Sequence, residues 1–160
     1  MTDITIRPYQ AGEVSYVAYL QMKFYEQTYG FKPVFEHYLL AAMVDFTRSP
    51  EGSQLWVALD GEEIIGSIAI VKAEDAGSAQ LRWFLVDADH QGRGIGKRLL
   101  DEALKFCHEQ GYHNVFLWTF RGLDAARHLY EEYGFTPAET KPNTEWSDKL
   151  LTEERWDLAL

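Results

Sequence analysis

Apolar residues recur at intervals of three and four in four segments of the chain, the spacing that places them on one face of a helix. Gly30, Gly111 and Gly134 stand just after three of these segments, where glycine is a common helix terminator because it adopts positive φ at low cost. Pro33 opens the second segment, and Ser49-Pro50 follows it. The pattern therefore predicts helices over residues 12–29, 33–48, 95–110 and 123–133.

Strands are indicated where β-branched and aromatic residues alternate or run together between turn residues. Pro8 favours an edge position for the first strand, and Asp60-Gly61 is a hairpin signal between the second and third. A polar loop over residues 141–148 separates the last two strands. The order β-α-α-β-β-β-α-β-α-β-β predicts an α/β (α+β) fold in one domain, residues 1–160. The expected strands are 4–6, 55–59, 63–71, 79–86, 114–119, a strand beginning at Phe135, and 155–160.

The overall composition excludes several classes of function. A net charge of −10 and a pI near 4.9 disfavour a nucleic-acid partner, whose phosphates would be repelled. Because Cys107 is the single cysteine, an internal disulfide framework and a cysteine-rich metal site are excluded. Its place on an apolar helix face indicates a side chain that is buried in the core. No signal-peptide pattern opens the chain, and no apolar run reaches the length of a membrane span. We therefore expect a soluble, cytoplasmic protein without a metal or a membrane partner.

A glycine-rich loop joins a predicted strand to the third predicted helix. The apolar run Leu81 to Val86 leads through an acidic turn into Gly92, Gly94 and Gly96, at which the helix begins. The first N–H groups of a helix lack intrahelical partners and carry the positive end of its dipole, so such a junction favours an anion. The spacing matches neither G-x-G-x-x-G nor G-x-x-x-x-G-K-[ST].

Read as [QR]-x-x-G-x-G, residues 91–96 resemble the acetyl-CoA loop of the GNAT superfamily of N-acetyltransferases. About forty residues later, His128-Leu-Tyr-Glu-Glu-Tyr-Gly-Phe135 resembles the "LYxxxGF" stretch of the family's last helix. The element order resembles the GNAT fold along the whole chain, and residues 80–135 look most like the acetyltransferase domains joined to MarR-type regulators, here as a stand-alone version. The resemblance implies a mixed, mostly antiparallel sheet of six or seven strands with a splayed central pair.

The resemblance also implies an acetyl-CoA-dependent N-acetyltransferase in which a primary amine attacks the thioester directly in a ternary complex. Leu85 and Val86 would pair through their backbone with the pantetheine arm. Tyr130 matches the family's general acid, which protonates the departing CoA thiolate. The residues implied for the pyrophosphate loop are Gln91, Gly92, Arg93, Gly94, Gly96 and Lys97.

The general base does not follow from the motifs. Some family members carry a Glu or His base on the strand before the loop, where this chain has Gln80 and Arg82. We take Glu26, near the end of the first helix, as the best candidate; the competing interpretation is a surface carboxylate. His37 and Glu145 are weaker alternatives.

One further departure concerns the cofactor. Leu123 stands where the family often has Asn, so any hydrogen bond made there is either absent or passes to Asp124 or Thr119, and we include Asp124 among the cofactor-binding residues. His90, directly before the loop, is expected to be a solvated turn residue.

For the acceptor, Arg82 would either anchor a carboxylate of an amino-acid-like substrate or form an ion pair at the strand edge. Tyr29 and Trp118 would complete the pocket. The aromatic first helix favours a closed pocket for a small-molecule amine over an open groove for a protein. Two other functions stay open: a CoA-binding sensor or partner module without transfer, and a protein or peptide N-acetyltransferase. A homodimer is compatible with the resemblance.

Overall fold

The computed structural model describes residues 3–160; the first two residues of the predicted domain lie outside this range. The helices are α1 (Glu13–Tyr29), α2 (Pro33–Arg48), α3 (Ile95–Gln110) and α4 (Asp124–Glu132), with a 3-10 turn, η1 (Ala88–His90). The strands are β1 (Ile4–Pro8), β2 (Gln54–Asp60), β3 (Glu63–Lys72), β4 (Ser78–Val86), β5 (Asn114–Phe120), β6 (Thr136–Asn143) and β7 (Leu151–Ala159). The predicted element order is confirmed.

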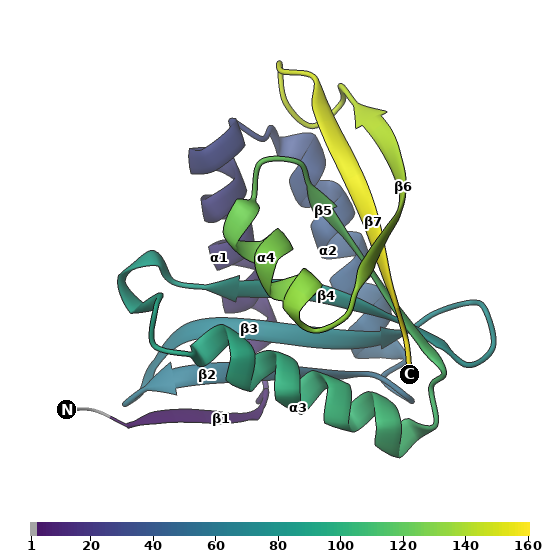
Figure 1. Cartoon of the computed structure of the whole chain (residues 1–160). Coiled ribbons are helices and arrows are strands. Elements are labelled where there is room, and N and C mark those ends of the chain that lie inside the picture. Colours follow the sequence, from purple (N-terminus) through teal and green to yellow (C-terminus); the bar gives the residue numbers. More distant parts are fainter. Residues whose placement is uncertain (1–2) are drawn as a thin grey trace.

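The seven strands form one sheet in the order β1-β2-β3-β4-β5-β7-β6 (Figure 1). Every neighbouring pair is antiparallel except β4 and β5, which run parallel. These two strands pair only between residues 78–80 and 114–116, and they diverge beyond that point. The mixed, mostly antiparallel sheet with a splayed central pair is therefore confirmed, and β1 lies at an edge as Pro8 predicts.

Each face of the sheet has its own hydrophobic core. α1 and α2 cover one face, where their apolar side chains pack on Leu55, Val57 and Leu59. α3 and α4 cover the other face, where they pack on Trp56 and Ala58 from the same strand (Figure 1). Because successive strand residues point to opposite faces, burial on both sides explains the nearly continuous apolar run of β2.

Cys107 is a free thiol buried in the core beneath α3, as its position on the apolar helix face predicts. Burial raises the pKa of this thiol to about 12, so it stays protonated and unreactive at neutral pH. Among residues 3–160, no helix has the length and apolar character needed to cross a membrane.

The sequence pattern misplaced two connections between strands. β6 continues to Asn143 and β7 already begins at Leu151, so the loop between them is shorter than the predicted 141–148. Seven of the eight β6 residues are exposed, so this edge strand has no apolar pattern and is defined by its pairing with β7. In the β2–β3 hairpin, Asp60 pairs with Glu63, and the turn is therefore Gly61-Glu62, one residue later than predicted.

Candidate active site

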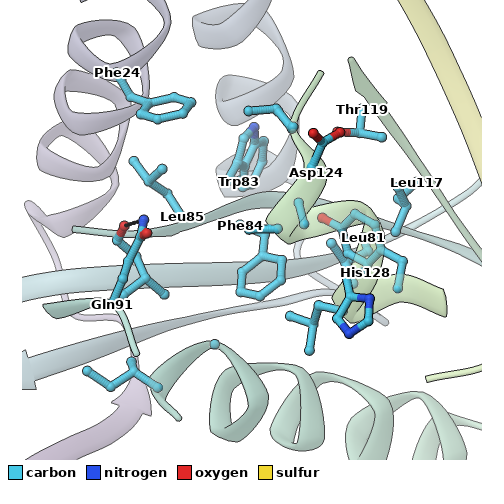
Figure 2. Close-up of a pocket in the computed structure, with 18 of the residues that line it drawn as sticks. Phe24, Leu81, Trp83, Phe84, Leu85, Gln91, Leu117, Thr119, Asp124 and His128 are labelled. Atoms are coloured by element: carbon cyan, nitrogen blue, oxygen red, sulfur yellow. Dashed lines mark hydrogen bonds between the residues drawn. The ribbon is translucent and has the colours of Figure 1, made fainter. Parts of the chain in front are cut away.

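Where β4 and β5 diverge, the structure contains a cavity of about 830 Å³ (Figure 2). Its walls come from α1, β4, β5, the start of α3 and α4, and its volume is typical of a small-molecule site. Most of the predicted site residues line it. They are Arg82, Leu85, Val86, Gln91, Gly92, Gly94, Gly96, Lys97, Trp118, Asp124 and Tyr130.

The glycine-rich loop brings an open helix end to this cavity. Gly92 and Gly94 have φ of 80° and 75°, a left-handed conformation that few side chains adopt easily, and Gly94 caps α3 without a side-chain hydrogen bond. The leading N–H groups of α3 are thus free of a side-chain cap and available to an anion. Gly96 is already helical, and a Cβ there would meet the Phe84 ring at an ordinary 3.6 Å. Packing within the described residues therefore leaves room for a Cβ at Gly96.

A bulge in β4 sets the strand edge that faces the cavity. Trp83 is the one non-glycine residue with positive φ (50°) among residues 3–160, and the β3–β4 register shifts between Ser67 and Ala69. The Ser67 hydroxyl donates a 2.6 Å hydrogen bond to the Trp83 carbonyl, which holds the bulge in place. A strained backbone at such a position is characteristic of functional sites.

Beyond the bulge, alternation of the ladder decides which backbone groups reach the cavity. The Asp87 N–H donates to the Ile65 carbonyl of β3 at 2.8 Å. Because the backbone groups of alternate residues in a strand point the same way, those of Leu85 also point toward β3. The backbone groups of Val86 therefore point away from β3. The Gln91 side chain donates to the Val86 carbonyl at 3.2 Å. Of the two residues predicted to pair with the pantetheine arm, only Val86 has backbone groups that point into the gap between β4 and β5. The prediction for the Leu85 backbone is therefore corrected, because its groups are committed to β3.

Tyr130 enters the cavity from α4 and is 5% exposed. Its ring packs near the rings of Phe84, Phe135 and Trp156. Burial raises the pKa of its phenol well above 10, with a smaller contribution from the Tyr25 hydroxyl. The group therefore keeps its proton throughout the physiological range, and no residue among 3–160 forms a hydrogen bond with its hydroxyl.

The wall on the α1 side is aromatic and polar. Phe24 and Tyr25, two aromatics of the first helix that favoured a closed pocket, both line it, together with Gln21 and Thr28. These residues follow the 3.6-residue period and so share one helix face. In Figure 2, Phe24 approaches the cavity from α1, above Trp83 and Leu85.

Arg82 lies in this part of the cavity without an anionic partner. Its guanidinium is 3.4 Å from Gln80 Oε1 and lies over the Trp83 ring at 5.5 Å. Burial lowers the pKa of Arg82, and no carboxylate of residues 3–160 forms an ion pair with it. The strand-edge ion pair that the sequence left open is therefore not formed.

Three predicted site residues lie outside the cavity. Glu26 is exposed, one residue beyond the cavity-facing side of α1, which agrees with the competing interpretation of a surface carboxylate. The Tyr29 ring packs between Tyr25 and Phe120 in the core. Arg93 is exposed at the tip of the loop.

The alternative bases also lie outside the cavity. His37 is exposed on α2. Glu145 is exposed and accepts a 2.9 Å hydrogen bond from the Tyr38 hydroxyl. Neither side chain reaches the space where an acceptor amine would lie.

His90 differs most from its prediction as a solvated turn residue. Its Nδ1 lies 3.0 Å from Asp87 Oδ2 and its Nε2 lies 3.0 Å from Asp60 Oδ2, and it lines the cavity. These two carboxylates raise the pKa of the imidazole. Asp60 is thirty residues away on β2, so no local signal could have revealed this contact. Among residues 3–160, no group of three or more metal-ligating side chains is arranged around an ion site.

The fold and the site together define a class of protein, an α/β domain whose sheet opens around a cavity of small-molecule size, with an uncapped helix N-terminus at one end. A family model described as the acetyltransferase (GNAT) family matches residues 15–135, and the chain belongs to this family. The resemblance that the two motifs predicted is confirmed. The narrower likeness to MarR-linked domains stays a prediction.

Two relatives show how much of a longer protein the chain covers. N-acetyltransferase 8B of Rattus norvegicus is 38% identical over 100 residues, which cover 58% of this chain and 45% of that protein. N-acetylaspartate synthetase of Danio rerio is 33% identical over 99 residues, which cover 62% of this chain and 35% of that protein. The chain thus spans less than half the length of these relatives.

Two solved structures share the fold. A GNAT-family acetyltransferase from Staphylococcus aureus Mu50 superimposes with a TM-score of 0.79 at 20% identity and covers 99% of both chains. YncA of Salmonella typhimurium, solved with its cofactor acetyl-CoA, has a TM-score of 0.77 at 17% identity, with coverage of 98% and 94%. At these identities, the likeness confirms the predicted fold.

Proposed function

We propose that this protein is an acetyl-CoA-dependent N-acetyltransferase whose acceptor is the primary amine of a small molecule. One observation carries the proposal: a single cavity runs from the open N-terminus of α3, along the unpaired edge of β4, to a closed aromatic wall on α1. A cavity of this shape can hold a long phosphate-bearing donor at one end and a small acceptor at the other. Membership of the acetyltransferase family supports the same conclusion.

The donor would be held at the N-terminus of α3 and along the edge of β4 that does not pair with β5. The N–H groups at the start of α3 suit the pyrophosphate, and the missing Cβ of Gly96 allows it to approach closely. The cavity-facing backbone of Val86 suits a pantetheine amide. Lys97 lines the cavity at the same helix end and adds positive charge, although it also pairs with Glu132 at 3.0 Å.

Acetyl-CoA supplies the acetyl group as a thioester. In the proposed step the amine nitrogen forms a bond to the acetyl carbon, and the carbon–sulfur bond breaks. Tyr130 donates its proton to the departing sulfur, which leaves as the CoA thiol. A cavity-facing N–H of β4 stabilises the negative charge that develops on the acetyl oxygen.

The amine must also lose a proton, and the lining leaves few groups to accept it. His90 is held by two carboxylates, and Glu132 is paired with Lys97. In Figure 2, the His128 side chain extends toward α3, whereas the Asp124 carboxylate lies farther from α3, near Thr119. We therefore assign the proton acceptor to Asp124, which the sequence placed beside the cofactor.

Two measurements test the proposal in sequence. Calorimetric titration with acetyl-CoA, with desulfo-CoA and adenosine diphosphate as controls, should show micromolar binding that depends on the pantetheine arm. Release of CoA thiol in the presence of small amines should follow, and it would eliminate a sensor or partner module without transfer. Turnover with peptides alone would replace the small-molecule acceptor by a protein, and an absence of binding at millimolar acetyl-CoA would refute the transferase.

The assignment of Asp124 has its own test. Asp124→Asn removes the proton acceptor but keeps the size of the side chain, so kcat should fall by roughly 100-fold at neutral pH. Raising the pH toward the pKa of the acceptor amine should restore part of the loss, because more of the amine is then already deprotonated. Equal activity of the variant and the parent at neutral pH would exclude this role.

A further inference from the structure

The acceptor end of the cavity contains a cation that the protein does not neutralise. Ala79 and Leu81 belong to the core beneath α3, so strand alternation places Arg82 on the opposite face of β4, toward α1. The Arg82 guanidinium is partly buried, and among residues 3–160 its hydrogen-bond acceptor is the neutral amide of Gln80 at 3.4 Å. A buried charge without a counter-charge is costly, which makes an anionic ligand the natural partner.

Several other arginines of this protein do pair with carboxylates, in contrast to Arg82. Arg7 forms two hydrogen bonds of 2.9 Å with Glu13, and Arg155 pairs with Asp157 at 3.0 Å. Arg127 lies 3.3 Å from the buried Glu154. The contrast identifies Arg82 as a partly buried arginine that lines the cavity and has no carboxylate partner for its fork-shaped donor set within residues 3–160.

Gln21 supplies an independent observation on the facing wall. It is 3% exposed, it lines the same cavity from α1, and its Nε2 has no hydrogen-bond partner within residues 3–160. A buried amide nitrogen normally finds an acceptor, since an unmade hydrogen bond is expensive. An oxygen-bearing ligand at this end of the cavity would satisfy both Gln21 and Arg82.

We propose that the acceptor is a small amino carboxylate, the class that includes the α-amino acids. Its carboxylate accepts hydrogen bonds from the Arg82 guanidinium, with Gln21 as a second polar contact, and its amine is directed toward the gap between β4 and β5. This inference rests on the proposed acetyl transfer and narrows it. The carboxylate takes no part in the chemistry, so Arg82 determines specificity by binding and is not a catalytic residue.

Matched acceptors test the inference. An amino acid is compared with its amide and with its decarboxylated amine, using release of CoA thiol as the readout. The intact amino acid should have a kcat/KM at least roughly tenfold higher than either analogue, because only it offers an anion to Arg82. Equal or higher kcat/KM for the decarboxylated amine would overturn the inference and leave the proposed acetyl transfer standing.

Variants separate binding from chemistry. Arg82→Met should raise the KM for the amino acid by at least roughly tenfold, with a small change in kcat and no change for the decarboxylated amine. Arg82→Lys keeps the charge but loses the fork, so it should be intermediate. Arg48→Met, at an exposed arginine at the end of α2, is the matched control and should match the parent. An equal loss for both acceptors in Arg82→Met would contradict the assignment.

A binding experiment keeps the inference testable if turnover is absent. The parent protein saturated with CoA is titrated with the amino acid and then with its amide, and Arg82→Met is titrated in parallel once acetyl-CoA titration shows that it is folded. Selective binding of the amino acid by the parent without thiol release would uphold the carboxylate site and refute the transferase. Binding of neither compound would overturn the carboxylate site.

Discussion

At the scale of single residues, the surroundings of Tyr130 give the sharpest prediction. Tyr130→Phe removes the proton donor but leaves the ring contacts with Phe84 and Trp156, so kcat should fall by roughly 100-fold while acetyl-CoA affinity stays unchanged. Because burial raises the pKa of this phenol, the parent should show no loss of rate below the ordinary tyrosine pKa near 10. Pre-steady-state rates of thiol release measure both.

Tyr133→Phe is the control, since Tyr133 is the C-cap of the same helix and its hydroxyl donates to Asp101 at 2.7 Å outside the cavity. An equal loss of kcat in both variants would attribute the effect to displacement of α4. An unchanged kcat in Tyr130→Phe, under conditions where chemistry limits the rate, would remove Tyr130 from the mechanism.

His90 gives a prediction about stability and pH. Both ring nitrogens face a carboxylate at 3.0 Å, so both must carry a proton to donate, and the folded-state pKa is raised above the ordinary 6.5. The stabilisation is complete below the unfolded pKa and is lost as pH rises through the folded pKa. The deficit in Tm of His90→Gln should therefore shrink as the pH rises above the ordinary histidine pKa of 6.5.

His37→Gln is the control for this measurement, because that imidazole is exposed on α2 and forms no ion pair. Its Tm should follow that of the parent at every pH. A deficit for His90→Gln that grows with pH would mean that the imidazole is neutral in the folded protein.

At the scale of elements, the glycines at the two ends of α3 allow the effect of a side chain on stability to be separated from its effect on cofactor binding. Gly94 at its N-terminus and Gly111 at its C-terminus have φ of 75° and 78°, and a Cβ at either would meet nothing within 4 Å. Valine at each should cost about 1–3 kcal/mol of unfolding free energy, because positive φ strains a β-branched residue. Only Gly94→Val should also weaken acetyl-CoA binding, by at least roughly tenfold, since it alone disturbs the N–H groups at the cavity.

Chemical denaturation and calorimetric titration of both variants separate the two effects. Full acetyl-CoA affinity in Gly94→Val would show that the loop is not the cofactor site. Equal weakening in Gly111→Val would show that binding follows the stability of α3 in general and not the loop geometry.

At the scale of the whole molecule, the cavity draws on elements from both faces of the sheet, so a ligand that binds it should stabilise the entire fold. At 100 times its Kd, acetyl-CoA should add about 2.7 kcal/mol by mass action. For a chain of this length that corresponds to a rise in Tm of about 5 to 10 °C. Differential scanning calorimetry measures the shift, and adenosine diphosphate at equal concentration should give a smaller one. A Tm that does not respond to saturating acetyl-CoA would contradict the proposed site.

The elements and the donor side of the site could be predicted because their signals are local. The periodicity of α3, its terminating Gly111 and the loop Gly92, Gly94 and Gly96 are written in consecutive residues. The same is true of the Leu129-Tyr130 motif. The extent of β6 to Asn143 could not be predicted in the same way, because its residues are exposed and are defined as a strand only by their pairing with β7.

The element order, the family and the residues that open α3 can be read from the sequence alone, since each depends on patterns of residues a few positions apart. Tertiary packing sets which face of α1 meets the cavity, and it leaves Glu26 on the surface and places Gln21 in the cavity wall. It likewise decided that Arg82 has no carboxylate partner and that His90 has two. Such contacts join strands and helices far apart in the chain, and their geometry exists only after the sheet has formed and splayed.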